Sequence, residues 1–412
     1  MLRPHCRRTR GDAALDEKWR AVRTQIIRYL EQYVYPVESE LDAASHEHRD
    51  TIMRQLMSQA RHQGLWALGH PKELGGQGAP FMAYVELNEV IGRSFYAMQA
   101  LGTLSLQDSL MLHRHAAAEW RHKYLEPLVA GEFVPSFAMT EPEVASSDPT
   151  QLQTEARLEA GCWVINGRKW FTTGAAAARY TTVMCRTEFE GRPHDAFSLI
   201  IVPTNAPGYR IVRETPVLGI CGGHYEIELK DLRVPQSSLL GERGQGFKIA
   251  QQRLGPGRIF HCMRWLGQAQ RAFDHMCRRL QVRTAFGGPL ASKQLLQGYV
   301  FESAAEIRAS RLLTLEAARK LDAGEEARDE IAIVKVVGAR MLHNVVDRAI
   351  QIHGAMGLTP DTPLDRMYRH AREARIYDGP DEVHIHSVAK RLLKHYAEGG
   401  PGVDFATGEP VS

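Results

Sequence analysis

Residues 162–174 read Cys-Trp-Val-Ile-Asn-Gly-Arg-Lys-Trp-Phe-Thr-Thr-Gly. Two runs rich in β-branched and aromatic residues, Cys162–Ile165 and Lys169–Thr172, flank the pair Asn166-Gly167. Asn-Gly between two such runs is the strongest short-range signal for a hairpin with a two-residue turn. The stretch therefore predicts a β-hairpin that turns at Asn166-Gly167, and with it a β domain in the middle of the chain.

Strand-like patterns continue beyond this stretch. They cover Tyr180–Cys185, Phe197–Val202, Arg210–Val212 and His224–Leu232. The last segment alternates the apolar residues Tyr225, Ile227 and Leu229 with polar ones, as a half-buried strand does. Residues 134–240 are therefore predicted to form the middle β domain.

Helical periodicity flanks this β domain on both sides. Before it, one apolar stripe is formed by Trp19, Val22, Ile26, Leu30 and Tyr33, and further helices are expected near residues 50–63, 81–100 and 105–130. After residue 241 the helical period returns for four or five long segments, to about residue 396. The predicted domains are an N-terminal α-helical domain (1–133), the middle β domain (134–240), a C-terminal helical domain (241–398) and a flexible Gly/Pro-rich tail (399–412). This order predicts an α+β multidomain fold.

Composition narrows the possible functions. The 412 residues include 51 basic and 48 acidic side chains, a near balance that leaves no electrostatic footprint for nucleic acid. No apolar run approaches the roughly 20 residues that span a bilayer. Six scattered cysteines suggest neither a disulfide framework nor a metal site, and fit a reducing compartment. The arginines among the first ten residues favour an unstructured basic start over a transit peptide. We expect a soluble protein without a metal.

A carboxylate near the C-terminus lies in a turn that leads into a helix. Residues 375–384 read Arg-Ile-Tyr-Asp-Gly-Pro-Asp-Glu-Val-His. Pro380 suits the first helical position, and Asp381 and Glu382 suit the positive end of the helix dipole. Asp378 is thereby fixed at the mouth of a helix, a placement that suits a catalytic base. On these residues alone, a structural role in starting the helix remains the alternative.

A second candidate site is the loop Phe137–Asp148, which opens the β domain. It carries small hydroxyl side chains and free backbone N–H groups, so it could bind a phosphate or the polar edge of a ring system. A surface turn before a strand is the alternative on this motif alone.

Several separated motifs, in this order, resemble the acyl-CoA dehydrogenase family. They are Phe137–Asp148, Asn166–Gly174, Leu254–Arg258, Arg283–Gly287, Gln351–Gly357 and the Asp378 turn. The resemblance covers about residues 17–395 and is closest to the subgroup that in animals forms the C-terminal part of kinase-like fusion proteins. It implies an N-terminal helical domain, a middle β-barrel-like domain and a C-terminal four-helix bundle.

The resemblance also implies FAD as cofactor. The implied FAD-binding residues of the β domain are Phe137, Met139, Thr140, Ser147, Trp170 and Thr172. Among them, Trp170 resembles the Trp that packs on the isoalloxazine, and Thr172 resembles the residue that bonds flavin N5. The loop after Thr140 is one residue longer than the common Thr-Glu-Pro-Gly-Ala-Gly-Ser-Asp form, so both Ser146 and Ser147 are candidates for substrate contact.

A further set of implied residues reaches the dinucleotide of a neighbouring subunit, or lies beside it. The set comprises Arg283, Phe286, Gln294, Gln351, Gly354 and Ala355. Arg suits this role because its fork can hold phosphate oxygens in a bidentate way. Pro380 and Glu382 stand where the family has a flavin-facing Thr and Gln. The resemblance therefore implies a homodimer or homotetramer.

By the resemblance, Asp378 takes the α-proton of an acyl-CoA thioester while a β-hydride passes to flavin N5, which gives a trans-2-enoyl-CoA. Arg258 is expected beside the substrate, and electron-transferring flavoprotein is the implied acceptor. Most of the family has Glu at the position of Asp378, and members with an earlier base carry it where this chain has Gly257; Glu382 is the second choice. Burial beside an acyl chain is expected to raise the pKa of Asp378.

Two other functions are compatible with the same resemblance. One is a flavin oxidase of the same fold, such as an acyl-CoA or nitroalkane oxidase, which would release peroxide. The other is a non-catalytic flavoprotein, either DNA-associated or an assembly factor, which the balanced charge disfavours. The subgroup suggests long, branched or oxygenated acyl chains. The expected compartment is the cytoplasm for a bacterial-type protein, or the mitochondrial matrix for a eukaryotic one.

Overall fold

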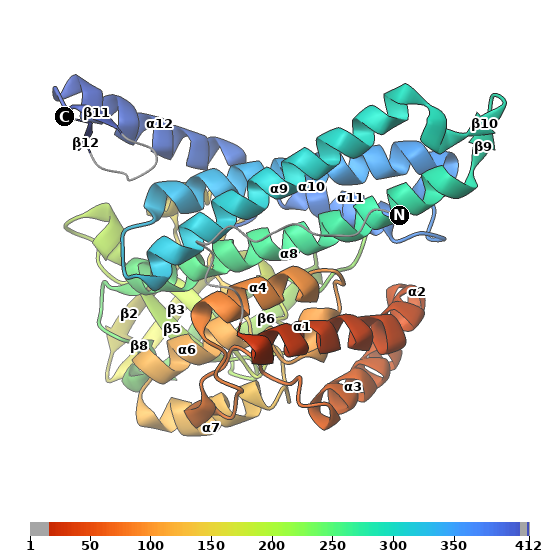
Figure 1. The fold of residues 1–412 in the computed structure, drawn as a ribbon. Coiled ribbons are helices and arrows are strands. Elements are labelled where there is room, and N and C mark those ends of the chain that lie inside the picture. The colour runs from red at the N-terminus through yellow and green to blue at the C-terminus, as the bar shows by residue number, and fades with distance from the viewer. Residues whose placement is uncertain (1–15, 404–409, 412) are drawn as a thin grey trace.

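The computed structural model describes residues 16–403 and 410–411. Its elements follow in a helical, a β and a second helical run (Figure 1). The first run comprises α1 (Glu17–Tyr29), α2 (Glu38–Ala43), α3 (His46–His62), α4 (Phe81–Ile91), α5 (Ala97–Ala100), α6 (Leu106–His115) and α7 (Ala118–Val129). The β run comprises β1 (Phe137–Ala138), β2 (Glu155–Glu159), β3 (Cys162–Thr173), β4 (Tyr180–Arg186), β5 (Phe197–Pro203), β6 (Tyr209–Glu214), β7 (His224–Pro235) and β8 (Leu239–Leu240).

The second helical run is made of long helices. It comprises α8 (Gly246–Val282), α9 (Gln294–Asp322), α10 (Arg328–His353), α11 (Leu364–Glu373) and α12 (Asp381–Ala397), with the short strand pairs β9 (Thr284–Ala285) and β10 (Gly288–Pro289), and β11 (Gly402–Val403) and β12 (Pro410–Val411). Helical runs before and after a central β run in the sequence confirm the predicted fold class. The predicted basic start lies outside the described residues, as do residues 404–409 and 412 of the predicted tail. Among the described residues, no helix has the length and apolar character that crossing a bilayer requires.

The central sheet is mixed. Its strand order is β6-β7-β3-β2-β4-β5-β8, and β1 pairs with β4 in parallel. The pairs β3–β7 and β4–β5 are antiparallel, and β4 and β5 are buried along almost their whole length. Strands buried on both faces read as continuous apolar runs, which explains why the sequence marked these two so clearly.

The predicted turn at Asn166-Gly167 is wrong, because β3 runs through both residues. The β2–β3 hairpin turns instead at Ala160 and Gly161, whose φ angles of 48° and 77° are those of a tight hairpin turn. The register of the β3–β7 pair shifts at Asn166. There the Oδ1 of Asn166 accepts a hydrogen bond of 2.8 Å from the backbone N–H of Asp231 in β7. Gly167 leaves room for Thr154, which a Cβ at this position would strike. The Asn-Gly pair thus serves a bulge and a close approach, two features that the local pattern does not distinguish from a turn.

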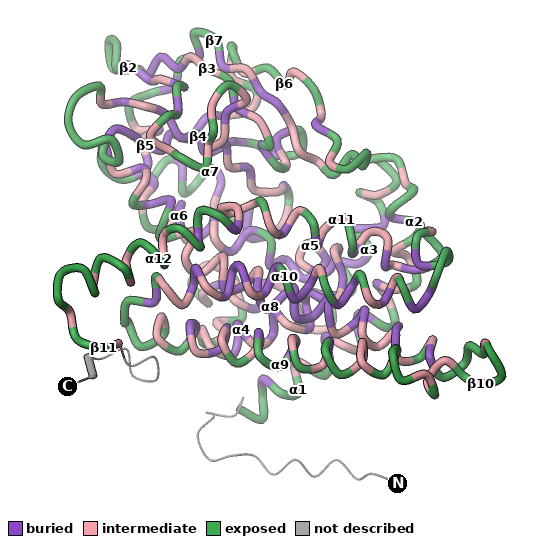
Figure 2. Tube along the Cα trace, turned by 90° about the horizontal axis from the view of Figure 1, so that it is seen from above, coloured by how far each residue is buried: buried purple, intermediate pink, exposed green. Residues whose placement is uncertain are grey.

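The two helical runs share one apolar core. A single cluster of buried side chains extends from Trp19 and Ile26 through α3 and α4 to α8, α10 and α11. Helices α4 and α8 come very close, because a Cβ on Gly92 would strike the backbone of Arg264 and one on Gly267 would strike that of Glu89. In Figure 2 the helices of both runs lie together below the sheet. This packing fixes α8, whose residues reach most parts of the candidate site.

Candidate active site

The turn that carries Asp378 joins α11 to α12. Asp378 and Gly379 both have left-handed φ angles, of 55° and 100°. A Cβ at Gly379 would lie 2.7 Å from the ring of His384, so glycine is required there. Pro380 is the N-cap and α12 begins at Asp381, one residue later than predicted. The sharp turn directs Asp378 toward α8.

Three cationic or ring donors hold this turn by its carbonyl groups. Arg258 Nε and His384 Nε2 each lie 3.1 Å from the Asp378 carbonyl oxygen. Lys335 Nζ donates to the Gly379 carbonyl at 2.6 Å. Lys335 is fully buried, and burial lowers its pKa to about 8. Arg258, predicted to lie beside the substrate, therefore also fixes the backbone of Asp378.

The Asp378 carboxylate lies against α8. Its Oδ2 is 3.3 Å from Nε2 of His261, and a quarter of the side chain (24%) is exposed. Burial opposes ionisation, but the hydrogen bond from His261 and the charges of Arg258 and Arg253 hold the pKa of Asp378 below its ordinary value. In the chain without a bound acyl group, the direction is thus opposite to the predicted rise, because these donors outweigh burial.

A chain of hydrogen bonds fixes the neighbouring Tyr377. Trp265 Nε1 donates to the Tyr377 hydroxyl at 2.8 Å, and this hydroxyl lies 3.4 Å from His370 Nε2. His370 Nδ1 lies 2.9 Å from Gln268 Oε1, which can only accept. The proton of the neutral imidazole is therefore on Nδ1, and the Tyr377 hydroxyl donates to Nε2. The chain requires an uncharged His370.

Replacement of His370 by Gln is expected to make the free energy of unfolding fall less steeply as the pH is lowered. Burial, then nearby basic side chains that include Arg264 and Arg366, lower the pKa of His370 from 6.5 to about 3. Between these two pH values, His370 is protonated in the unfolded chain and neutral in the folded chain. The stabilisation is present above pH 6.5 and is lost as the pH falls toward 3, by about 1.4 kcal/mol per pH unit.

The measurement is the free energy of unfolding in urea at a series of pH values. His62→Gln, at an exposed histidine of α3, is the control and should keep the slope of the wild type. Equal slopes for wild type and His370→Gln would contradict the role of His370.

The β3 residues predicted to face the flavin lie at a bulge. Lys169 pairs with Ile227 and Thr172 with Tyr225, so Trp170 and Phe171 together oppose one residue of β7. Phe171 has a left-handed φ of 49° within this bulge. The bulge leaves Trp170 half-buried rather than in the core, and Thr172 fully buried.

The loop Phe137–Asp148 is tied to this bulge. Thr140 Oγ1 donates to the carbonyl of Trp170 at 2.7 Å, and the N–H of Trp170 donates to the carbonyl of Thr140 at 3.0 Å. Fully buried Lys169 donates to Met139 O at 2.9 Å and to Glu141 Oε1 at 2.8 Å. Glu141 also accepts from the N–H groups of residues 153 and 154. Sequence reasoning missed Lys169 and Glu141, because a charged pair that joins a strand to a loop leaves no periodic signal.

Within the same loop the two candidate serines differ. Ser146 Oγ accepts from the N–H of Glu141 at 2.9 Å and so closes the loop on itself. Ser147 is exposed. Phe137 pairs in β1 beside β4, and Arg253 lies 4.8 Å over its ring, so α8 reaches this end of the loop as well.

The bulge and loop fit the polar edge of a flavin. Thr172 Oγ1 is buried and has no hydrogen-bond partner among the described residues. A buried hydroxyl without a partner costs about 1–3 kcal/mol, so the site favours a ligand that binds it. The half-buried indole of Trp170 beside it offers an aromatic face to a planar ring. These residues fit FAD.

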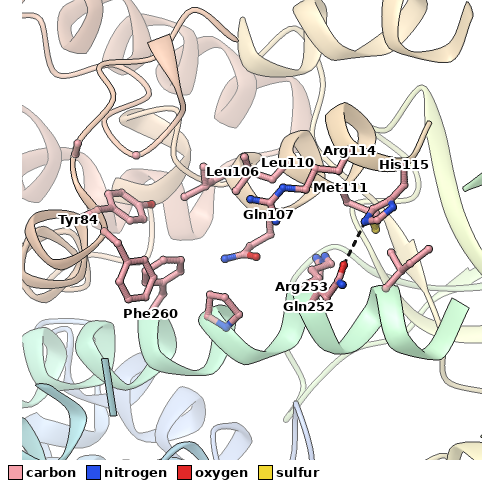
Figure 3. A pocket seen from close by; sticks show the side chains of 15 residues that line it. Tyr84, Leu106, Gln107, Leu110, Met111, Arg114, His115, Gln252, Arg253 and Phe260 are labelled. Carbon is pink, nitrogen blue, oxygen red and sulfur yellow. Dashed lines mark hydrogen bonds between the residues drawn. The ribbon is translucent and has the colours of Figure 1, made fainter. Parts of the chain in front are cut away.

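A cavity of about 230 Å³ lies between α4, α6 and α8 (Figure 3). It is lined by Gly69, Ala79, Phe81, Tyr84, Leu106, Gln107, Leu110, Met111, Arg114, His115, Ile249, Gln252, Arg253, Pro256 and Phe260. In Figure 3, the rings of Tyr84 and Phe260 lie at one end, and Arg114, His115 and Gln252 lie at the other. His115 and Gln252 are linked by a hydrogen bond of 3.2 Å. The cavity thus has an aromatic end and a polar end.

The residues predicted to reach the dinucleotide of a neighbouring subunit lie at the β9–β10 hairpin, at the start of α9 and at the end of α10. The β9–β10 hairpin projects from the end of the helical bundle, remote from β3 in both Figures 1 and 2. All six residues predicted to reach the dinucleotide are exposed: Arg283, Phe286, Gln294, Gln351, Gly354 and Ala355. Phe286 is 97% exposed on the hairpin. Glu382 is also exposed, on α12, where the buried carboxylate is Asp381, held by Arg375 and Arg340.

Comparison with known proteins gives three family models that match the chain in order. The acyl-CoA dehydrogenase N-terminal domain matches residues 16–132, the middle domain residues 136–232 and the C-terminal domain residues 244–393. Probable acyl-CoA dehydrogenase FadE2 of Mycobacterium tuberculosis is 41% identical over 397 residues, 93% of this chain and 97% of that protein. Acyl-CoA dehydrogenase family member 10 of Mus musculus is 40% identical over 90% of this chain.

The chain spans only 36% of that mouse relative, and about half of family member 11 from several vertebrates. Among solved structures, one from Mycobacterium abscessus described as an acyl-CoA dehydrogenase superposes with a TM-score of 0.88 at 34% identity, covering 92% of this chain and 99% of that one. The three sources agree on one family across nearly the whole described chain.

Proposed function

Because this chain belongs to the acyl-CoA dehydrogenase family, we propose that it oxidises an acyl-CoA to the trans-2-enoyl-CoA with Asp378 as the base. The chain is a flavin-dependent oxidoreductase, with FAD as cofactor. The observation that carries the proposal is the position of Asp378, an ionised carboxylate fixed in a left-handed turn against α8. The oxidase and non-catalytic alternatives remain outcomes of the test below.

Proton removal falls to the free oxygen of Asp378. Its Oδ2 faces His261, whereas its Oδ1 forms no hydrogen bond within the described part of the chain. Oδ1 would accept the α-proton as the electron pair moves into the thioester enolate. The backbone N–H of Asp378 likewise has no acceptor among residues 16–403, so it can donate to the thioester oxygen. FAD, when bound, supplies the acceptor for the hydride that leaves the β-carbon.

The acyl chain would enter the cavity between α4, α6 and α8. Leu106, Leu110 and Phe260 offer it apolar surface. Arg253 lines the same cavity, and its charge acts on Asp378, which supports a short path from the cavity to the base. Arg258, Ser146 and Ser147 remain the proposed contacts for the rest of the substrate.

Anaerobic titration of the FAD-loaded protein with acyl-CoAs of graded length and branching tests this function. We expect at least one of them to bleach the oxidised flavin, and electron-transferring flavoprotein to reoxidise it. Stoichiometric peroxide in air would favour the oxidase. If no acyl-CoA reduces the flavin, the catalytic proposal fails and the non-catalytic function gains support.

We also propose that a second copy of the chain completes the FAD site. The β9–β10 hairpin is held rigidly, since Lys293 Nζ donates to the Phe286 carbonyl at 3.0 Å and Leu290 N donates to Arg283 O at 2.8 Å. A nearly fully exposed aromatic ring on a rigid hairpin, next to an arginine, fits a contact with the partner's dinucleotide rather than solvent.

Phe286→Ser is expected to lower the FAD bound per chain by at least about tenfold, because an aromatic anchor at an interface often contributes 2 kcal/mol or more. The measurement is the ratio of flavin to protein absorbance after gel filtration, together with the mass of the assembly. Phe189→Ser, at a half-exposed ring (49%) on a loop beside the sheet, is the matched control. Equal FAD content in both variants would exclude the contact.

A further inference from the structure

The carboxylate of Asp378 has a neighbour that the proposed mechanism does not use. Helix α8 presents His261 one turn after Arg258, and its Nε2 lies 3.3 Å from Asp378 Oδ2. The imidazole ring packs against two aromatic side chains, with ring centroids 6.1 Å from Trp265 and 5.1 Å from Tyr377, and 31% of the His261 side chain is exposed. The orientation of the His261 ring is therefore set by packing.

The hydrogen-bond partners of His261 define its tautomer. Arg264 Nη2 lies 2.9 Å from His261 Nδ1. Because a guanidinium only donates, Nδ1 must accept, and the proton of the neutral ring is on Nε2. His261 therefore donates to Asp378 Oδ2.

Arg264 is itself anchored in the core. Its Nη1 donates to Asn88 Oδ1 at 3.0 Å, and Asn88 Nδ2 donates to the carbonyl of Tyr84 at 2.8 Å. Asn88 and Arg264 are both buried, on the two helices that Gly92 and Gly267 bring into close contact. The donor chain therefore extends from α4 through α8 to the turn before α12.

We propose that His261 is a positioning residue, which holds Oδ2 of Asp378 by hydrogen bonding so that Oδ1 faces the α-carbon of the substrate. His261 does not take up the proton itself, since Nε2 already carries one and Nδ1 faces the cation of Arg264. An aspartate is one methylene shorter than glutamate and has fewer ways to reach its target. A donor that fixes one carboxylate oxygen meets this need for alignment. The inference rests on the proposed role of Asp378.

Other charged groups also face Asp378, so the test must separate their effects. Arg253, Arg258 and Arg264 come from α8, Lys335 from α10 and His384 from α12. Arg258 and His384 contact the carbonyl oxygen of Asp378, and Lys335 contacts the next carbonyl. His261 contacts the carboxylate of Asp378 and not its backbone. Its hydrogen bond can therefore be removed without changing the contacts of Arg258, His384 and Lys335 to the backbone carbonyl groups.

The experiment compares His261→Leu, which has no donor, with His261→Gln. The glutamine amide can donate to Asp378 and accept from Arg264. With saturating acyl-CoA, the anaerobic rate of flavin bleaching is measured across pH. We expect His261→Leu to be about 10 to 100 times slower at neutral pH and to lose rate in acid at a higher pH than the wild type. Loss of the donor raises the pKa of Asp378, so more of the base is protonated. His261→Gln should recover most of the rate and the wild-type pH dependence.

A second measurement needs neither substrate nor turnover. Infrared difference spectra on acidification report the C=O stretch that appears when Asp378 is protonated, with Asp378→Asn as the reference that lacks it. This band should appear at higher pH in His261→Leu than in wild type or His261→Gln. If His261→Leu binds less FAD than the wild type, His261→Met replaces it.

The inference is overturned if all variants share one infrared midpoint, or if His261→Gln is as slow as His261→Leu, which indicates packing alone. If no acyl-CoA reduces the wild-type flavin, the proposed function fails, while the infrared midpoints still decide the contact.

Discussion

Asp378→Asn is expected to lose flavin reduction by acyl-CoA while it still binds FAD and substrate. The amide has the size of the carboxylate, and its oxygen can accept the His261 donor that now faces Oδ2. It cannot take up the α-proton at neutral pH. A positioned general base contributes about 10²- to 10⁴-fold, and we expect at least that loss. The measurement is the anaerobic rate of flavin bleaching at saturating acyl-CoA.

Glu382→Gln is the matched control for this variant. It makes the same carboxylate-to-amide change one turn away, at an exposed side chain of α12. We expect its rate to stay within about twofold of the wild type, since exposed substitutions have small effects. The opposite result, a fast Asp378→Asn and a slow Glu382→Gln, would transfer the role of base to Glu382.

Lys169→Met is expected to destabilise the protein by about 3–5 kcal/mol, because it leaves the buried Glu141 carboxylate without its counterion. The side chains of Lys169 and Glu141 are 0% and 2% exposed. Burial acts to raise the pKa of Glu141, but Lys169 and two backbone donors hold it below its ordinary value. The measurement is urea unfolding of the FAD-free protein, followed by circular dichroism.

An exposed ion pair on the same sheet calibrates this loss. Arg233 and Glu159 are 57% and 52% exposed at 3.4 Å, and Arg233→Met should cost only about 0–1 kcal/mol. The double variant Glu141→Gln, Lys169→Met should lose less than the sum of the two single losses, since each single variant leaves a buried unpaired charge and the double variant leaves none. A loss for Lys169→Met no larger than that for Arg233→Met would show that the buried pair does not hold the loop to β3.

The sequence predicted the helical and β runs because their periods differ. The stripe from Trp19 to Tyr33 became α1 and the helical turns that follow it, and the apolar runs at 180 and 197 became β4 and β5. The turn predicted at Asn166-Gly167 was wrong because the same two residues suit a turn and a bulge. The difference between these outcomes depends on Asp231 and Thr154, which only the folded sheet brings near.

The site was predictable only in part, for a physical reason. Asp378 was found from its turn, a local feature of Gly379 and Pro380. The groups that set its pKa come from other helices: Arg258 is 120 residues away in the sequence, and His261 lies on the same face of α8. Lys335 sits within an apolar helix and carried no signal of its own. The sequence-based prediction of a raised pKa for Asp378 was wrong because it did not include the donors that lower this pKa.

The distance between the β9–β10 hairpin and β3 has a consequence for inheritance. Under the proposed assembly, each FAD site takes its base from one copy and its dinucleotide contact from another. A chain damaged at Asp378 and a chain damaged at Phe286 would then carry their defects in different halves of a site. When both are made in one cell, mixed assemblies would contain some sites built from two undamaged halves. Two inactive alleles could thus complement each other. The activity that remains would depend on whether the two alleles damage the same half of the site or different halves.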